Sequence, residues 1–220
     1  MKKIKKWAPL KITVATLGAV TLLAGCATTP NTAAPTPAGT ATDRTAFRKD
    51  KDIQKVWLAN GFNFTGYDTL YIAATGFQAA ERANETQMRT MAIGGVQQEL
   101  ATAIRNSGLF QSVVVRPEEI RPGTRVLTME NTIIEYEKGG GGARFFVGLY
   151  GAGQPVIKVR GQISESGRPL FQYEARRSGE SGGARLMGGY MSDEKIQRDD
   201  IHDLAIDVAD FMRRTAGRKK

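Results

Sequence analysis

The chain has 220 residues and a formal charge of +9, from 31 lysines and arginines against 22 aspartates and glutamates. Five of the lysines lie in a leading segment that we expect to be removed, which leaves 26 basic and 22 acidic residues mixed along the chain. This mixing argues against a nucleic-acid partner, and the single cysteine excludes intramolecular disulfides, cysteine zinc sites and thiol catalysis in the mature domain.

Residues 1–25 are predicted to form a signal peptide. Five lysines within the first eleven residues precede an apolar run over 12–24, which is shorter than the roughly 20 apolar residues of a membrane-spanning helix. The run ends in Leu23-Ala24-Gly25-Cys26, which resembles the lipobox of bacterial lipoproteins. The resemblance implies cleavage before Cys26, a diacylglyceryl group on its thiol and a further acyl chain such as palmitate on the freed amine.

The lipobox also implies a location. More than one acyl chain holds a protein durably at a bilayer, at about 0.8 kcal/mol for each buried CH2 group. Ala27 follows the cysteine in place of aspartate, which in enterobacteria-like sorting implies the outer membrane. We therefore expect a lipid anchor on Cys26 in the outer membrane, with the domain facing the periplasm or the cell surface. The alternative is that Cys26 is an unmodified residue of the signal.

Residues 26–46 are predicted to be a flexible tether. After the cysteine they are rich in Ala, Thr and Pro and contain no aromatic residue, Leu, Ile or Val, so nothing there offsets the entropy of ordering. A coil of this length has a root-mean-square span of about 25 Å. Residues 47–220 then suffice for one domain with its own core.

The first half of that domain shows two strands and a helix. Residues 47–60 are mixed and are expected to begin with a short helix, whereas 67–73 are rich in β-formers. A helix is predicted over 83–107, with an apolar stripe of Ile93, Val96, Leu100, Ala103 and Ile104. Residues 109–116 are the next predicted strand.

Two glycines interrupt the predicted helix. Met88 and Met91 lie off its apolar stripe, so the helix is either buried on two sides at its start or bends at Gly94-Gly95. The glycine pair would also admit a close neighbour. A third strand is expected over 125–137, where the apolar phase shifts and suggests a bulge near residues 130–132.

A β-hairpin is the clearest local pattern. Its inward positions pair odd-numbered with odd-numbered residues, so the loop must contain an odd number of residues and a two-residue turn is excluded. A loop of Glu165-Ser166-Gly167 would place Phe171 opposite Gly161 and Lys158 opposite Glu174, whereas Ser166-Gly167-Arg168 would place Tyr173 opposite Gly161. The apolar residues that alternate with polar ones are Ile157, Val159, Ile163, Phe171, Tyr173 and Ala175.

A closing helix is expected to begin near Ser192, with Phe211 at the edge of its buried stripe. The element order predicts an α+β fold, in which an antiparallel or mixed sheet of about five strands carries two main helices on one face. The residues of the buried stripe are Ile201, Leu204, Ala205, Val208 and Met212.

The residues that usually carry chemistry are sparse. His202, the only histidine, lies at helical spacing from Asp199 and Asp203, but the helical wheel turns this trio away from the core, so we expect solvated side chains and no metal site. No catalytic residue or cofactor is predicted. The chain ends in a basic cluster that either complements the helix dipole or meets anionic headgroups. The cluster comprises Arg213, Arg214, Arg218, Lys219 and Lys220.

A glycine-rich aromatic segment over 139–153 is the candidate partner site. It lacks the spacing of a phosphate-binding or dinucleotide-binding loop. Both faces of residues 145–150 are apolar, so the segment is either a buried strand or an exposed edge that docks a partner or enters the bilayer. The residues expected to contact a partner are Arg144, Phe145, Phe146 and Tyr150.

A longer stretch that includes this segment, about residues 67–212, resembles the bacterial lipoprotein domain catalogued as domain-of-unknown-function family 4410. That family implies a fold but transfers no catalytic residue. The matching features are Arg144, Gly148, Gly151-Ala152-Gly153, the strand over 156–163, Ser166-Gly167, Leu170-Phe171 and Gly182-Gly183.

Three functional hypotheses follow. The favoured one is a non-enzymatic envelope lipoprotein that binds or scaffolds another envelope protein. The second is an auxiliary lipoprotein that binds a lipid or small ligand for a transport system, which an apolar pocket between sheet and helices would favour. The third is a hydrolase, which a cleft with two buried acids of perturbed pKa would favour.

Overall fold

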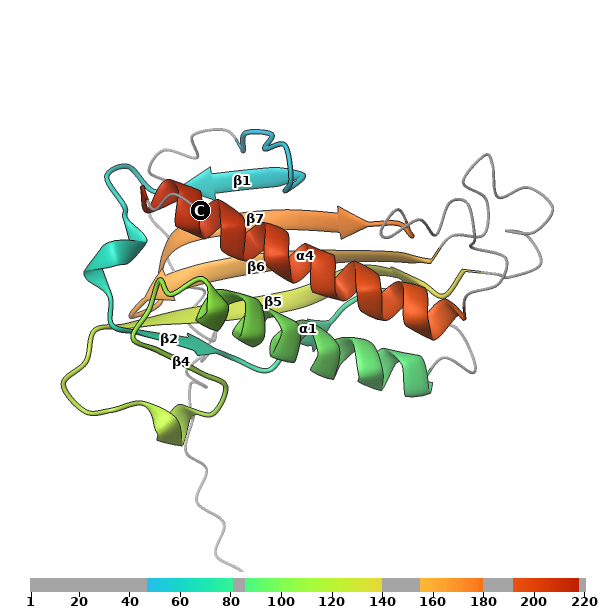
Figure 1. The fold of residues 1–220 in the computed structure, drawn as a ribbon, viewed down its shortest axis with the longest axis horizontal. Coiled ribbons are helices and arrows are strands. Elements are labelled where there is room, and N and C mark those ends of the chain that lie inside the picture. The colour runs from blue at the N-terminus through green and yellow to red at the C-terminus, as the bar shows by residue number, and fades with distance from the viewer. Residues whose placement is uncertain (1–46, 81–85, 140–154, 180–191, 218–220) are drawn as a thin grey trace, which may run out of the picture. The chain divides into compact units, whose positions relative to one another are not determined.

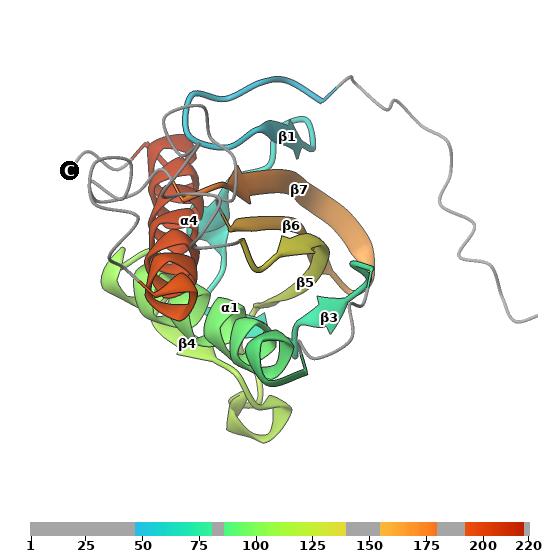
Figure 2. The same ribbon diagram turned by 90° about the vertical axis from the view of Figure 1, so that its right-hand side faces the viewer.

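A computed structural model describes residues 47–80, 86–139, 155–179 and 192–217, and the structural statements below concern these residues. They form one mixed sheet with two long helices on the same face, as Figures 1 and 2 show. The α+β prediction is confirmed, with seven strands in place of about five. The strands are β1 (Lys55–Leu58), β2 (Thr69–Ile72), β3 (Gly76–Phe77), β4 (Ser112–Val114), β5 (Val126–Glu137), β6 (Val156–Glu165) and β7 (Arg168–Arg177), and the helices are α1 (Thr86–Asn106) and α4 (Asp193–Thr215).

The sheet runs in the order β1-β7-β6-β5-β2-β4, with β3 also paired to β5. Strands β5, β6, β7 and β1 are antiparallel neighbours, whereas β2 pairs in parallel with both β4 and β5. Strand β1 therefore lies at one end of the sheet. Its outer edge has no neighbouring strand among the described elements.

The short helix expected at the start of residues 47–60 is absent, and β1 occupies part of that segment. The Asp50 side chain explains the difference, because its Oδ1 accepts hydrogen bonds from the backbone N–H groups of Asp52 (3.0 Å) and Ile53 (3.3 Å). This local turn competes with helical hydrogen bonding and redirects the chain. Ile53 is buried as a result.

Both predicted helices are present, and their apolar stripes form the core with the inner face of the sheet. Ser192 caps α4 by accepting the Lys195 N–H, which confirms the predicted start. Phe211, expected at the edge, is buried and stacks on Phe171 with ring centroids 5.3 Å apart. The two methionines of α1 differ, since Met88 is buried and Met91 is 44% exposed.

The glycine pair in α1 marks a close helix contact. A Cβ placed on Gly95 would lie 3.5 Å from Ile201 Cδ1 of α4, so the two helices approach closely there. The expectation of a near neighbour at this pair is confirmed. Gly94, by contrast, faces open space.

The bulge in β5 lies between Ile133 and Glu135, a little beyond the predicted position at residues 130–132. The reason is Asn131, which takes an inward position between Met129 and Ile133 although it is polar. Inward alternation therefore continues to Ile133. Because Asn131 is polar, the apolar pattern of the sequence does not show that the inward alternation continues.

The β6–β7 hairpin has all its predicted inward residues buried, and odd positions pair with odd. Tyr173 lies opposite Gly161, which is the register of the competing loop and corrects the favoured one. The exclusion of a two-residue turn was also wrong. Ser166 and Gly167 form such a turn with φ of 50° and 81°. A register shift between Ile163 and Ser164 then lets odd-numbered residues pair with odd-numbered ones along the rest of the hairpin.

Gly161 is the residue that admits this register. The Tyr173 ring lies over it, and a Cβ at position 161 would overlap the ring. The Tyr173 hydroxyl donates a 2.8 Å hydrogen bond to Asn131 Oδ1, and complete burial raises the pKa of this phenol. The three residues thus join β5, β6 and β7 inside the core.

On the sheet face away from the helices, Glu174 of β7 holds three cations. Its oxygens lie 3.2 Å from Lys55 Nζ of β1, 3.1 Å from Lys158 Nζ and 2.9 Å from Arg160 Nη2 of β6. Arg160, and not Lys158 as predicted, stands directly opposite Glu174. Burial alone would raise the pKa of Glu174, but the hydrogen bonds from Arg160, Lys158 and Lys55 outweigh it and lower the pKa to about 2.

The first prediction concerns Gly161. The Gly161→Ala variant is expected to lose about 1–3 kcal/mol or more of unfolding free energy, because the new methyl group displaces the Tyr173 ring. Urea unfolding followed by circular dichroism measures the loss. Gly94→Ala is the matched control and should gain up to about 1 kcal/mol, since it adds a methyl group in open space on a helix. Equal stability of the Gly161→Ala variant and the unmodified protein would contradict the packing described.

A second prediction concerns pH. Because the folded pKa of Glu174 lies below its ordinary value of 4.5, its stabilising effect is complete above that value and is lost as the pH falls towards 2. Glu174→Gln should therefore lower the unfolding free energy at pH 7 by about 1–3 kcal/mol, with a deficit that shrinks below pH 4.5. Urea titrations across this range test it, with the exposed Glu118→Gln as control. A deficit of the same size at pH 7 and pH 2.5 would refute the linkage.

Candidate functional site

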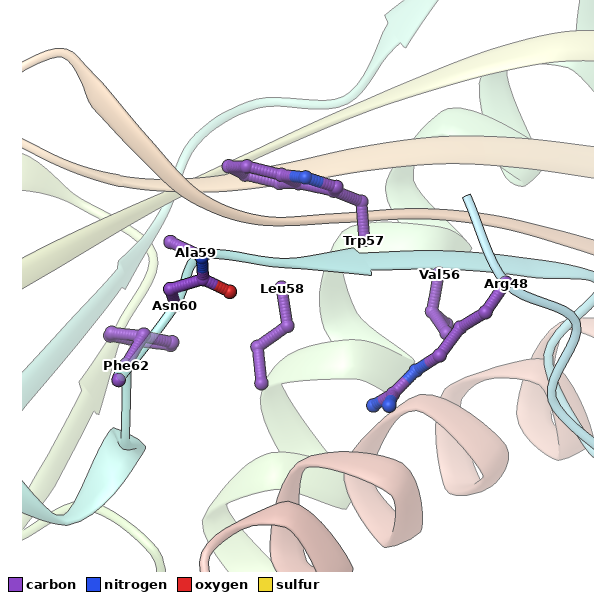
Figure 3. Close-up of a pocket in the computed structure, with 8 residues that line it drawn as sticks. Arg48, Val56, Trp57, Leu58, Ala59, Asn60 and Phe62 are labelled. Carbon is purple, nitrogen blue, oxygen red and sulfur yellow. The ribbon is translucent and has the colours of Figure 1, made fainter. Parts of the chain in front are cut away.

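The outer edge of β1 borders a groove of about 380 Å³, shown in Figure 3. The strand supplies one wall and the turn after it supplies the end. The groove is lined by Arg48, Val56, Trp57, Leu58, Ala59, Asn60, Gly61 and Phe62.

The direction of the backbone N–H and C=O groups of β1 determines which hydrogen bonds its outer edge can form. Val56 points its N–H and C=O away from β7, where they pair with the C=O and N–H of Arg48 at 2.9 Å each. Because alternate residues of a strand face the same way, the N–H and C=O of Leu58 also point outward. Ala59 turns back and donates its N–H to Leu170 O of β7 at 2.9 Å. Within the described residues, no hydrogen bond engages the outward backbone of Leu58.

The side chains of the groove divide between two faces. Figure 3 shows Val56, Leu58 and Arg48 on the side of helix α4, and Trp57 on the opposite side of β1. Arg48 is exposed, and within the described ranges no carboxylate forms an ion pair with it. Among the described residues, Trp57 Nε1 is buried and has no hydrogen-bond partner. In this part of the chain, the edge therefore combines apolar surface with a cation outside any ion pair and with unmatched donors.

The turn that ends the groove is held by aromatic packing. Phe62 packs edge-to-face on Phe64, with ring centroids 4.8 Å apart, and lies 6.0 Å from Tyr67. Gly61 adopts φ of 71°, a left-handed conformation that a side chain would strain. The turn is thus a fixed wall of the groove.

A second hollow of about 370 Å³ lies across the same turn. Tyr67 donates its O–H to Glu165 Oε2 at 2.9 Å, Arg125 donates from Nη2 to Glu165 Oε1 at 3.0 Å, and the Arg125 guanidinium lies 4.4 Å from the centre of the Tyr67 ring. Burial, followed by the bond to Glu165, raises the pKa of Tyr67. Hydrogen bonds from Arg125 and Tyr67 lower the pKa of Glu165. Glu165 is held ionised with both oxygens engaged, which suits a structural network better than proton transfer.

The predicted lipidation residue Cys26 and the predicted partner residues Arg144, Phe145, Phe146 and Tyr150 lie outside the described residues. Their roles stay predictions. The Gly182-Gly183 loop lies outside as well.

The histidine of α4 lies at the surface, as expected. His202 is 55% exposed at its side chain, with Nδ1 2.8 Å from Glu99 Oε2 of α1, and Asp199 pairs with Lys195 at 3.1 Å. Asp200, next to this trio, is fully buried and accepts the Gly179 N–H at 2.7 Å, which the helical wheel did not single out. Within the described residues no group of three or more His, Cys, Asp or Glu could hold a metal ion.

The basic cluster at the end of α4 has a structural role in part. Arg213 pairs with Asp210 at 2.9 Å, and Arg214 pairs with Asp50 at 3.2 Å and with Asp52 at 2.8 Å. The last turn of α4 is therefore tied to the segment that precedes β1. In the part of the chain that is described, neither helix has the length and apolarity to cross a membrane.

No protein-family model and no curated protein matches the chain. Among solved structures, it is similar to the PelC dodecamer from Paraburkholderia phytofirmans, at 12% identity and a TM-score of 0.45 over 69% of this chain and 96% of that one. It is also similar to a protein of domain-of-unknown-function family 330 from Xanthomonas campestris, at 10% identity and a TM-score of 0.40 over 73% and 91%. A minor lipoprotein from Acinetobacter baumannii matches at 13% identity and a TM-score of 0.32 over 69% and 95%. None of these likenesses identifies a family or a function for the chain.

Proposed function

We propose that the protein is a non-enzymatic lipoprotein of the bacterial envelope, anchored to the outer membrane through Cys26, whose domain binds another envelope protein. The observation that carries the proposal is the lysine-rich apolar leader that ends in Leu23-Ala24-Gly25-Cys26. A flexible tether of about 20 residues then separates the anchor from the domain.

The described domain supports binding better than catalysis. The carboxylates whose pKa is lowered, such as Glu174 and Glu165, are held ionised by arginine or lysine and serve the fold. A catalytic acid needs the opposite shift, a pKa raised towards neutrality. The β1 edge, in contrast, offers outward backbone groups, apolar side chains and Arg48, which no described carboxylate pairs with, at one surface.

We assign the partner site to this edge. An exposed sheet edge pairs readily with an extended segment of another chain, because its N–H and C=O groups are already aligned. The available edge is short, because the outward N–H and C=O of Val56 already pair with the backbone of Arg48 and the chain turns after Ala59. Side-chain contacts with Leu58 and Phe62 would therefore supply much of the affinity. The segment with Arg144, Phe145, Phe146 and Tyr150 is a second candidate surface.

The anchor is tested with Cys26→Ala. We expect this variant to leave the membrane fraction and appear in the soluble periplasm, and to lose incorporation of radiolabelled palmitate. Ala27→Asp is the matched control, because it should keep the acyl chains while redirecting the protein to the inner membrane. Retention of Cys26→Ala in the membrane fraction would contradict the lipid anchor.

The partner site is tested by a photo-crosslinking amino acid at the exposed position Asn60 in intact cells. We expect a crosslink to an envelope protein that Leu58→Pro reduces about fivefold, because proline removes an outward N–H worth about 1 kcal/mol without taking a bond from β7. Leu58→Val keeps that N–H and should retain most of the crosslink. Crosslinks found only within the chain would mean that the protein covers this edge itself, and would contradict the assignment.

A further inference from the structure

We propose that the point where the tether enters the domain is a second membrane contact, which docks on anionic lipid headgroups. This surface, the entry patch, consists of Phe47, Arg48, Lys49 and Lys51. The inference rests on the proposed function for the presence of a membrane nearby. Its chemistry depends only on residues of the described domain.

The entry patch is exposed and combines an aromatic ring with cations. Phe47 is 48% exposed, which is more than Met91 or Ile206, the other exposed large hydrophobic residues of the described chain. Arg48 and Lys49 are exposed, and within the described residues neither has a carboxylate partner. An apolar ring flanked by lysine and arginine is the composition that partitions into a headgroup region.

The two acidic residues of this segment are already occupied. Asp50 accepts from Arg214 at 3.2 Å, and Asp52 accepts from Arg214 at 2.8 Å and lies 3.1 Å from Lys51 Nζ. Arg214 brings its positive charge from α4, so the carboxylates do not cancel Arg48 and Lys49. The segment keeps a net positive surface although it contains two aspartates.

The same ion pairs bring the end of α4 to the entry patch. Helix α4 ends at Thr215, directly after Arg214. Arg214 therefore brings positive charge from the end of the helix to the segment that carries Arg48 and Lys49. Each such residue near an anionic bilayer surface strengthens binding about fivefold.

The test uses the unlipidated mature chain, residues 26–220 with Cys26→Ala, and vesicles of phosphatidylcholine with or without 30% phosphatidylglycerol. We expect sedimentation with the anionic vesicles only. Binding should fall when salt rises from 0.1 M to 1 M, because the Debye length shortens from about 10 Å to about 3 Å. Arg48→Gln combined with Lys49→Gln should weaken binding more than tenfold, at about fivefold for each charge.

The matched control removes two other exposed arginines, Arg121 and Arg198, by the same change to glutamine. It should alter binding by less than twofold. An equal loss in the control would show that net charge alone drives binding and would overturn the proposal. Unchanged vesicle binding by the Arg48→Gln/Lys49→Gln variant, with loss of a protein crosslink in cells, would assign the patch to a protein partner and overturn it too.

Insertion of the aromatic ring gives an independent readout. Trp57 is the only tryptophan after the signal, so Phe47→Trp in a Trp57→Phe background reports on position 47 alone. We expect quenching by brominated phospholipid in the anionic vesicles. Absence of quenching together with absence of sedimentation would refute the docking. Because this chain carries no acyl group, the result does not depend on lipidation of Cys26, which the fractionation of the Cys26→Ala variant in cells tests separately.

Discussion

The packing of Tyr173 on Gly161 is the constraint from which the rest of the sheet follows. The ring needs a position with no side chain on the neighbouring strand, and its hydroxyl needs Asn131 on the next one. These two requirements fix the register of β6 and β7. The register in turn sets Glu174 opposite Arg160, and on its other edge β7 pairs Glu174 with Lys55 of β1. The core thus fixes the strand on which β1, and the groove beside it, are built.

Strand β1 is short, and electrostatic contacts fix it at two places. Glu174 draws Lys55 onto β7 from the face away from the helices, and Arg214 holds Asp50 and Asp52 just before the strand. A four-residue edge strand has few ladder hydrogen bonds of its own, so these contacts determine how well it is ordered. Both sets of ion pairs leave Arg48 unpaired within the described chain. The arrangement stabilises the edge while keeping a cation available at the surface.

Elements that are long enough to show a period could be predicted from the sequence. The ten-residue strands of the hairpin and the two long helices were predicted because their buried positions repeat several times. The short strands β2 and β4 were predicted from their β-forming residues and not from a period. Strands β1 and β3 have four and two residues, too few for any alternation to stand out, and were missed. The bulge was predicted at the wrong residues because of Asn131. From the sequence, a polar side chain that forms a hydrogen bond inside the core cannot be distinguished from one in water. The groove was missed for a related reason, since an outward N–H is a property of pairing and leaves no trace in residue type.

The tether changes how strong the entry patch has to be. A free domain would need tight binding to stay on a membrane, but with the proposed anchor and a tether of about 20 residues the domain would meet the surface at the high effective concentration of a short flexible linker. Weak, salt-sensitive docking would then be enough to bias its orientation. Arg48 belongs to both surfaces, because its backbone pairs with Val56 and its side chain lines the groove. Docking through the entry patch would hold the β1 edge close to the bilayer, where a partner that is itself bound to the membrane can reach it.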